Sequence, residues 1–335
     1  MDSSLRSTLL TFFIGLLGSL IGLLGVGLHP AGAQPDPPVE PVFSDEEQTP
    51  KVPDSTEADS GWSYDATARL NVSQAAYKDW QEGGGLNSLS ISAATGGVAQ
   101  ERRGDWLQTH ELRFAFGVLN QENQALRKSE DQIRYQSSLR YQGDGFFRVF
   151  NPTVATQLRT QFASGFKYSD GNPFEGEVPP GDSRLDQQEP PFETSSFFAP
   201  AFLTESIGLT YQPAEILTLR LGAASKQTIV VEENFRELYG VDPGALARVE
   251  AGAEFASSLD AQLTENIRYR SDLNAFFAVN QLEDPPDVLW ENEVILSVND
   301  WLTTNLEFTA LYDQTTIDAI QLRETISVGI SFTLL

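Results

Sequence analysis

The sequence predicts an all-β protein: a single antiparallel transmembrane β-barrel of about twelve strands, preceded by a signal peptide and a disordered acidic linker. Long runs of alternating apolar and polar residues fill the chain from residue 62 onward. Turn-forming residues separate these runs, and aromatic residues concentrate near the ends of the runs. Together these patterns favour strands that cross a bilayer over the shorter strands of a soluble sandwich.

The last run, "ETISVGISFTLL" (324–335), shows the alternation most clearly. Ile326 and Val328 fall on one face of an extended strand, whereas Ser327 and Ser331 fall on the other. Successive side chains of a strand point to opposite faces, so this strand has one apolar and one polar face. An apolar face suits lipid as well as a protein core, so this run alone leaves a soluble barrel or sandwich open.

About twelve such runs are predicted, and an even number is typical of a single-chain bacterial outer-membrane barrel. With the N-terminus inside, the odd-numbered links face outward and are long, and the even-numbered links are short turns. Links five and seven are the long ones, at about 169–200 and 232–246, whereas "QGDG" (142–145), "QPAE" (212–215) and "VNDW" (298–301) are tight. The runs lie at about 66–73, 88–93, 112–118, 132–141, 146–168, 207–211, 217–221, 248–255, 267–277, 290–299, 306–313 and 324–335.

The N-terminal residues 1–33 predict a secretory signal peptide. An apolar stretch follows Arg6, and "AGA" (31–33) supplies small residues for cleavage. The apolar stretch is about long enough to cross a bilayer, so an uncleaved anchor is the alternative. Residues 34–61 are rich in proline and acids and predict a disordered linker, which leaves residues 62–335 for the barrel. We therefore expect export to the bacterial outer membrane.

The chain carries a formal net charge of −25 and contains no cysteine. The acidic balance argues against nucleic acid as a partner, because phosphate binding needs a basic face. No thiolate site, H-E-x-x-H motif or calcium-loop spacing occurs, so we expect no metal and no cofactor. The acids crowd into predicted links such as 169–200, where three roles stay open: solvation, binding of divalent ions beside lipopolysaccharide, and protection from aggregation.

Aromatic residues give a separate indication of a membrane barrel, because such barrels place them at both bilayer interfaces. The predicted apolar faces carry them near both ends of the strands. The inner interface is predicted to hold Tyr64, Trp106, Tyr141 and Tyr211, and the outer interface Trp290 and Tyr312.

The stretch "LNVSQAAYKDWQEGGGLNSLSISA" (70–93) joins a strand motif, a tryptophan, a glycine cluster and a second strand. It resembles the start of the domain of unknown function 3078 family, which are outer-membrane barrel-like proteins. Stretches at 264–277, 287–313 and 322–332 are similar too, so the resemblance covers about 62–335. It implies a barrel in the outer membrane and no particular activity, since none is established for the family.

An outer-membrane location predicts three kinds of partner: membrane lipid, lipopolysaccharide and the machinery that assembles barrels. Assembly signals of barrels usually end on an aromatic residue, whereas this chain ends on Leu335, so Phe332 and Leu334 are expected to serve instead. The oligomeric state stays open.

No catalytic site is predicted. His110 lies two residues from Leu112 and is therefore predicted on the same outward face of its strand. That face has no neighbouring serine for nucleophilic catalysis. Glu291 and Glu293 share one strand face, but paired structural carboxylates are expected in a wet lumen lined with arginines. We therefore do not expect an enzyme.

The inward faces of the strands carry the candidate functional residues. Bases gather on the third, fourth, fifth and seventh strands, and acids on the eighth to eleventh. In a ring of twelve, the fourth strand stands opposite the tenth, so Arg134 and Arg140 should face Glu291 and Glu293 across the lumen. The predicted lumen-facing residues along a possible solute path are Arg113, Arg134, Arg140, Arg159, Arg220, Glu250, Glu254, Glu291, Glu293 and Glu307.

Two interpretations of this lumen remain at the level of sequence. An open lumen with opposed charged walls makes a narrow channel for small polar solutes. A lumen in which the same side chains pair makes a non-conducting structural or docking barrel. Strand number does not decide, because about eight strands fill with side chains and about sixteen leave a channel. A soluble β-barrel or sandwich that binds a ligand is the alternative from another class.

Overall fold

The computed structural model describes residues 61–75, 87–122, 124–279, 285–299, 301–314 and 317–334. Every described residue belongs to one compact unit, which lies within Pro37–Leu335. The predicted signal peptide, nearly all of the predicted linker and the glycines at 83–85 lie outside the described residues.

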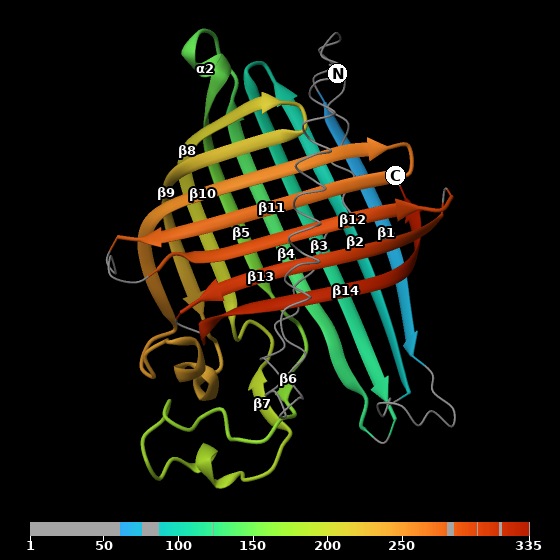
Figure 1. The fold of residues 1–335 in the computed structure, drawn as a ribbon. Coiled ribbons are helices and arrows are strands. Elements are labelled where there is room, and N and C mark those ends of the chain that lie inside the picture. The colour runs from blue at the N-terminus through green and yellow to red at the C-terminus, as the bar shows by residue number, and fades with distance from the viewer. Residues whose placement is uncertain are drawn as a thin grey trace. The chain divides into compact units, whose positions relative to one another are not determined.

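Twelve antiparallel strands close into one barrel, which confirms the predicted fold class (Figure 1). The strands are 11 to 18 residues long, ample for a tilted transmembrane strand. The ring closes where Thr67 to Val72 pair with Thr333 to Val328. In order around the ring, the strands are β1 (Trp62–Ala75), β14 (Ile317–Thr333), β13 (Leu302–Asp313), β12 (Asp287–Ser297), β11 (Ile267–Ala278), β10 (Ala247–Thr264), β9 (Leu217–Ile229), β8 (Ala201–Ala214), β5 (Phe150–Thr160), β4 (Arg127–Tyr141), β3 (Trp106–Gln121) and β2 (Ser88–Arg103).

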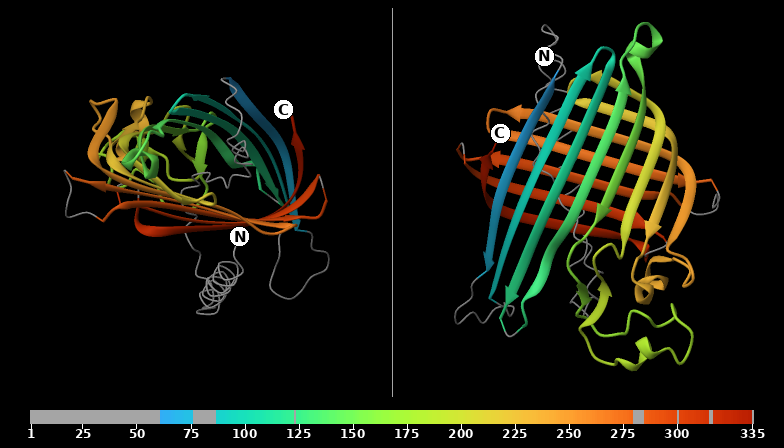
Figure 2. Two further views of the ribbon diagram at one scale, coloured as in Figure 1. Left: turned by 90° about the horizontal axis from the view of Figure 1, so that it is seen from above. Right: turned by 180° about the vertical axis from the view of Figure 1, so that it is seen from behind.

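The strands are steeply tilted, so those on one wall cross those on the opposite wall. Figures 1 and 2 show β11 to β14 running across β1 to β5. Closing a sheet requires such a tilt, typically about 35–45° to the barrel axis. Strands that face each other are therefore displaced along the axis as well as around the ring.

The links differ in length at the two ends of the barrel. One end, which we call the short-link end, carries the tight turns 104–105, 215–216 and 265–266, together with α2 (Phe146–Val149). The other, the long-link end, carries the links 161–200 and 230–246, so the two long links are where the sequence predicts them. These links contain β6 (Gly165–Lys167), η1 (Ser183–Asp186), β7 (Phe192–Ser195), η2 (Glu233–Phe235) and η3 (Glu237–Tyr239), with β6 and β7 paired in a separate sheet.

The predicted fifth strand, 146–168, is too long at both ends. At its start, Gly145 adopts a left-handed φ of 62° and leads into α2, so β5 begins at Phe150. At its end, the carboxylate of Asp131 accepts hydrogen bonds from the backbone N–H groups of Phe162 (3.0 Å) and Ala163 (2.7 Å). A side chain thus replaces the strand partner, and the chain leaves the barrel.

The outward face of the barrel is apolar and exposed, although a water-soluble protein would bury such side chains. Ile207, in the middle of β8, is 66% exposed. No helix among the described residues is long and apolar enough to cross a membrane. The exposed apolar residues of the strands include Leu70, Val72, Leu112, Phe114, Val154, Ile207, Leu209, Leu221, Ile326 and Val328.

If this face contacts lipid, the Ile207→Arg variant should lose about 2–4 kcal/mol of stability, because the charge lies near the bilayer midplane. Ser258 lies on an exposed inward position of β10, so Ser258→Arg should cost far less. Urea unfolding of the protein folded into lipid vesicles measures both variants. In water, a surface change such as Ile207→Arg stays within about 0.5 kcal/mol, so a neutral result would reject lipid contact.

Candidate functional site

The interior of the barrel is polar, and several of its charged side chains form ion pairs. Glu254 and Glu293 are 1% and 2% exposed, and Asn305 and Thr210 are also fully buried. Alternation within each strand places these residues opposite the apolar outward positions. Buried charges are stable only when they are paired and hydrogen-bonded, so the pairing of these side chains determines the shape of the interior.

One ion pair crosses the barrel from wall to wall. Nη2 of Arg134, on β4, donates to both carboxylate oxygens of Glu291, on β12, at 3.1 and 3.2 Å. Counted from β1, β12 is the fourth strand of the ring and β4 is the tenth, so six places separate them in a ring of twelve. Both side chains are buried. The pair therefore spans the full width of the lumen.

Further bridges link strands that are not neighbours. Lys226 on β9 donates to Asp287 on β12 (2.6 Å) and to Asp313 on β13 (2.9 Å). All three residues lie near the long-link ends of their strands. Arg69 on β1 lies 3.9 Å from Glu293 on β12. The sequence analysis did not identify Asp287 as a lumen residue. It is the first residue of its strand, where the alternation does not yet show which face a side chain is on.

Arg220 and Glu254 form a pair of a different kind, because they lie on the adjacent strands β9 and β10. Nη2 of Arg220 donates to both oxygens of Glu254 at 3.1 Å. Asn274 donates a further bond to the same carboxylate at 2.9 Å. This pair stays on one wall and does not cross the lumen.

A cavity of about 280 Å³ occupies the half of the barrel toward the short-link end. Most of its lining residues lie toward the start of β3, β5, β9 and β11 and toward the end of β4, β8 and β10. Leu289 and Glu291 line it from the first half of β12. Five arginines and five carboxylates line it among many serines and threonines. The charged lining residues are Arg113, Arg134, Arg140, Arg220, Arg270, Glu111, Glu254, Asp260, Asp272 and Glu291.

The other predicted lumen residues have local partners. Arg113 pairs with Glu111 on its own strand at 2.8 Å, and Arg248 pairs with Glu250 at 3.2 Å. The guanidinium of Arg159 lies 4.9 Å from the ring centre of Phe202. Glu307 stands directly opposite Glu293 in the pairing of β13 with β12.

Arg140 lines the same cavity as Glu291, which lies on the opposite wall. It donates to the side-chain oxygen of Gln212 at 3.4 Å. Arg140 lies one residue before the short-link end of β4, whereas Glu293 lies deeper in β12.

The predicted interface aromatics lie near strand ends and contact other rings. Trp106 and Tyr141 pack with centroids 5.0 Å apart, and Tyr211 packs on Phe150 at 5.1 Å. Tyr64 stacks on Trp62 at 6.3 Å. At the long-link end, Trp290 packs edge-on against Phe308 and donates from its indole nitrogen to Ser271. Tyr312 is half-buried and pairs with Val288.

His110 has two side-chain hydrogen-bond partners among the described residues, and neither is a serine. Its Nδ1 lies 2.9 Å from the hydroxyl of Tyr135, and its Nε2 lies 2.7 Å from the amide nitrogen of Gln108. Trp62 stacks on the ring at 5.8 Å. No group of three or more metal-ligating side chains occurs in the described part of the chain.

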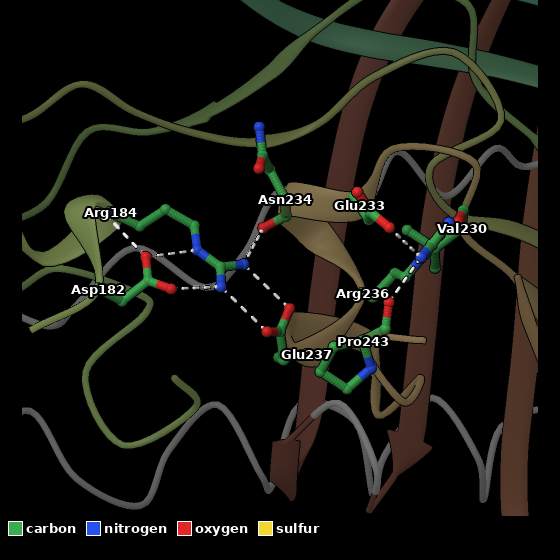
Figure 3. Close-up of polar contacts among 8 residues, drawn as sticks. All are labelled: Asp182, Arg184, Val230, Glu233, Asn234, Arg236, Glu237 and Pro243. Atoms are coloured by element: carbon green, nitrogen blue, oxygen red, sulfur yellow. Dashed lines mark hydrogen bonds and ion pairs between the residues drawn. The ribbon is translucent and has the colours of Figure 1, made fainter. Parts of the chain in front are cut away.

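The two long links share a hydrophobic core of their own, which we call the cap. Phe174 and Val178 of link 161–200 pack with Phe235, Tyr239 and Val241 of link 230–246. Figure 3 shows how Arg184 joins the links: it donates to Asp182 at 2.8 and 2.9 Å and to Glu237 at 2.9 and 3.0 Å. No sequence pattern predicts this contact, because it joins residues of two separate links.

Arg184 also changes the acid–base properties of its partners. Its hydrogen bonds lower the pKa of Asp182 to about 2 and the pKa of Glu237 below its ordinary value. Arg236 donates separate hydrogen bonds to the carboxylate of Glu233 and to the backbone oxygen of Pro243 (Figure 3). Part of the acid excess of the links therefore has a structural role inside the cap.

Comparison with known proteins gives one family match. The model of the family described as protein of unknown function DUF3078 matches residues 72–166. The predicted resemblance is confirmed over that stretch. No curated protein matches the chain.

Several solved structures of outer-membrane proteins are similar to this chain. They include the translocator domain of the autotransporter NalP from Neisseria meningitidis (8% identity, 80% of this chain and 86% of that chain, TM-score 0.35). A second similar structure is an outer membrane channel from Pseudomonas putida F1 (7% identity, 83% of this chain and 98% of that chain, TM-score 0.36). A third is the toluene transporter TodX from Pseudomonas putida (9% identity, 82% of this chain and 90% of that chain, TM-score 0.32). The fold itself rests on the strand pairing described above.

The pKa of Asp182 provides a test of the cap. In the parent protein, the carboxyl of Asp182 should titrate at about 2, and in Arg184→Gln its pKa should rise toward its ordinary value of about 3.9, although the backbone N–H of residue 184 still donates to it. Because the folded pKa is lowered, this contribution to cap stability is complete above about pH 4 and is lost as the pH falls toward 2. Carboxyl ¹³C NMR, with Asp182→Asn for assignment, measures the midpoint.

Arg236→Gln is the matched control, because it removes an arginine of the same cap that does not contact Asp182. It should leave the midpoint of Asp182 unchanged. If Asp182 of the parent protein titrated at its ordinary pKa of about 3.9, the contact between Arg184 and Asp182 would be absent.

Proposed function

We propose that the chain is an integral outer-membrane β-barrel with a narrow, ion-paired lumen that passes only small polar solutes. The Arg134–Glu291 pair carries this proposal, because it joins opposite walls and divides the lumen. A wide general-diffusion pore has no contact of this kind across its diameter. The cavity beside the pair supplies a polar compartment of solute size.

The membrane part of the proposal rests on the outward face of the barrel. Exposed Leu, Val, Ile and Phe side chains surround the strands, with aromatic residues near the strand ends. A soluble binding barrel would expose this surface to water at a large cost in hydrophobic free energy. The short-link end then faces the periplasm and the cap faces outward, as outer-membrane barrels require. Membrane lipid, lipopolysaccharide and the barrel assembly machinery are the partners that this placement implies.

A non-conducting structural barrel is the second candidate. The bridges from Lys226 to Asp287 and Asp313 favour it, because they join three strands near the long-link end. The two candidates share the fold and differ in whether the ion pairs separate during passage of a solute. Conductance distinguishes them.

The protein reconstituted in planar bilayers should show small single-channel steps. The double variant Arg134→Ser with Glu291→Ser should show larger steps, because both side chains leave the lumen and no buried charge is left unpaired. The matched control is Arg220→Ser with Glu254→Ser, which removes an equivalent pair from one wall of the same barrel. The control should increase the step less than the cross-lumen variant does.

Silence of the parent protein, in a sample shown to be folded, would reject the channel and leave the structural barrel. Equal single-channel conductance in both double variants would show that the Arg134–Glu291 pair does not limit conduction through the lumen.

A further inference from the structure

Two charged side chains in the lining of the cavity have no ion-pair partner among the described residues. Arg140 and Asp272 both line the cavity, on β4 and β11. β11 is the fifth strand of the ring and β4 the tenth, so the two residues lie on nearly opposite walls. Each of the other charged residues of the lining has an ion-pair partner, as Arg134 has Glu291 and Arg220 has Glu254.

Arg140 lies at the basic side of the cavity, close to its short-link end. Its hydrogen-bond partner is the neutral side chain of Gln212, at a long 3.4 Å. The charged groups near it are two further arginines, Arg220 and Arg102. A guanidinium in such surroundings favours an anion, and its planar donors fit a carboxylate.

Asp272 lies at the acidic side of the cavity. Its side chain is exposed within the barrel, and its hydrogen-bond partner is the hydroxyl of Ser258 on β10. The carboxylate of Glu291 and the guanidinium groups of Arg134 and Arg113 lie near it. Since Arg134 already donates to Glu291 and Arg113 is paired with Glu111, the charge of Asp272 is available to a cation that enters the cavity.

We propose that this cavity binds a small zwitterion, with its carboxylate on Arg140 and its ammonium group on Asp272. The volume of about 280 Å³ lies just below the range of ordinary ligand pockets and limits the ligand to a small molecule. The proposal rests on the proposed function, since it names the class of solute that the narrow lumen takes. Opposed unpartnered charges select a zwitterion because a ligand with one charge leaves the other side chain without a partner.

Isothermal titration of the full chain, folded in detergent micelles, tests the site with an unbranched series: glycine, β-alanine, 4-aminobutyrate and 6-aminohexanoate. At least one member should bind saturably and about ten-fold more tightly than butyrate or butylamine, which each satisfy one charge. Arg140→Gln and Asp272→Asn should each weaken that binding about ten-fold or more.

The matched control is Arg148→Gln with Asp144→Asn. It removes one base and one acid from exposed positions of the link beside Arg140, outside the lining of the cavity. Binding to this variant should stay within about two-fold of the parent protein, a change of under about 0.5 kcal/mol. Strand content by circular dichroism confirms that each variant is folded.

Conductance in the same samples separates the two proposals. Saturable zwitterion binding without conductance would support the zwitterion site and reject the channel. Conductance without binding of any member of the series would reject the zwitterion site and support the channel. Equal binding of butyrate or butylamine, or full binding by either single variant, would also overturn the zwitterion site.

Discussion

Closure of the ring between β1 and β14 is the constraint on which the rest of the structure depends. In a bilayer every backbone N–H and C=O group needs an internal partner, and only a closed barrel gives a sheet no free edge. Pairing of Thr67 to Val72 with Thr333 to Val328 completes the ring. Once twelve strands are closed, β4 stands opposite β12, and the arginine of one wall reaches the carboxylate of the other. The interior contacts are thus a consequence of strand number and closure.

The ion pairs of the lumen set its shape more than its stability. Removing two charges from water costs several kcal/mol per ion, and mutual attraction offsets this only when the geometry is good. Arg134 meets that condition with two hydrogen bonds to Glu291. An interior of apolar side chains would be as stable, but it would fill the lumen and exclude polar solutes. The paired charges keep the interior polar, and a cavity remains beside them.

Alternation was sufficient to predict the fold, because an apolar outer face and a polar interior require a period of two along every strand. It also predicted that Arg134 would face Glu291, since counting strands gives the position of each strand around the ring. Counting does not give the shift along the axis, so the contact of Arg140 with Gln212 was missed. The end of β5 was missed because the carboxylate of Asp131, which is distant in sequence, takes over the backbone donors. Both failures come from contacts between distant residues, which a periodic pattern does not record.

The two ends of the barrel differ in a way that bears on access to the cavity. At the long-link end, Lys226 joins β9 to β12 and β13, and the links beyond it form a cap with its own core. At the short-link end the links are tight turns and α2, and there the cavity and Arg140 are found. In the proposed channel, with the short links in the periplasm, a solute would reach Arg140 from that side. Passage to the outside would then require the Arg134–Glu291 pair to separate, so the contact that shapes the cavity would also limit the proposed transport.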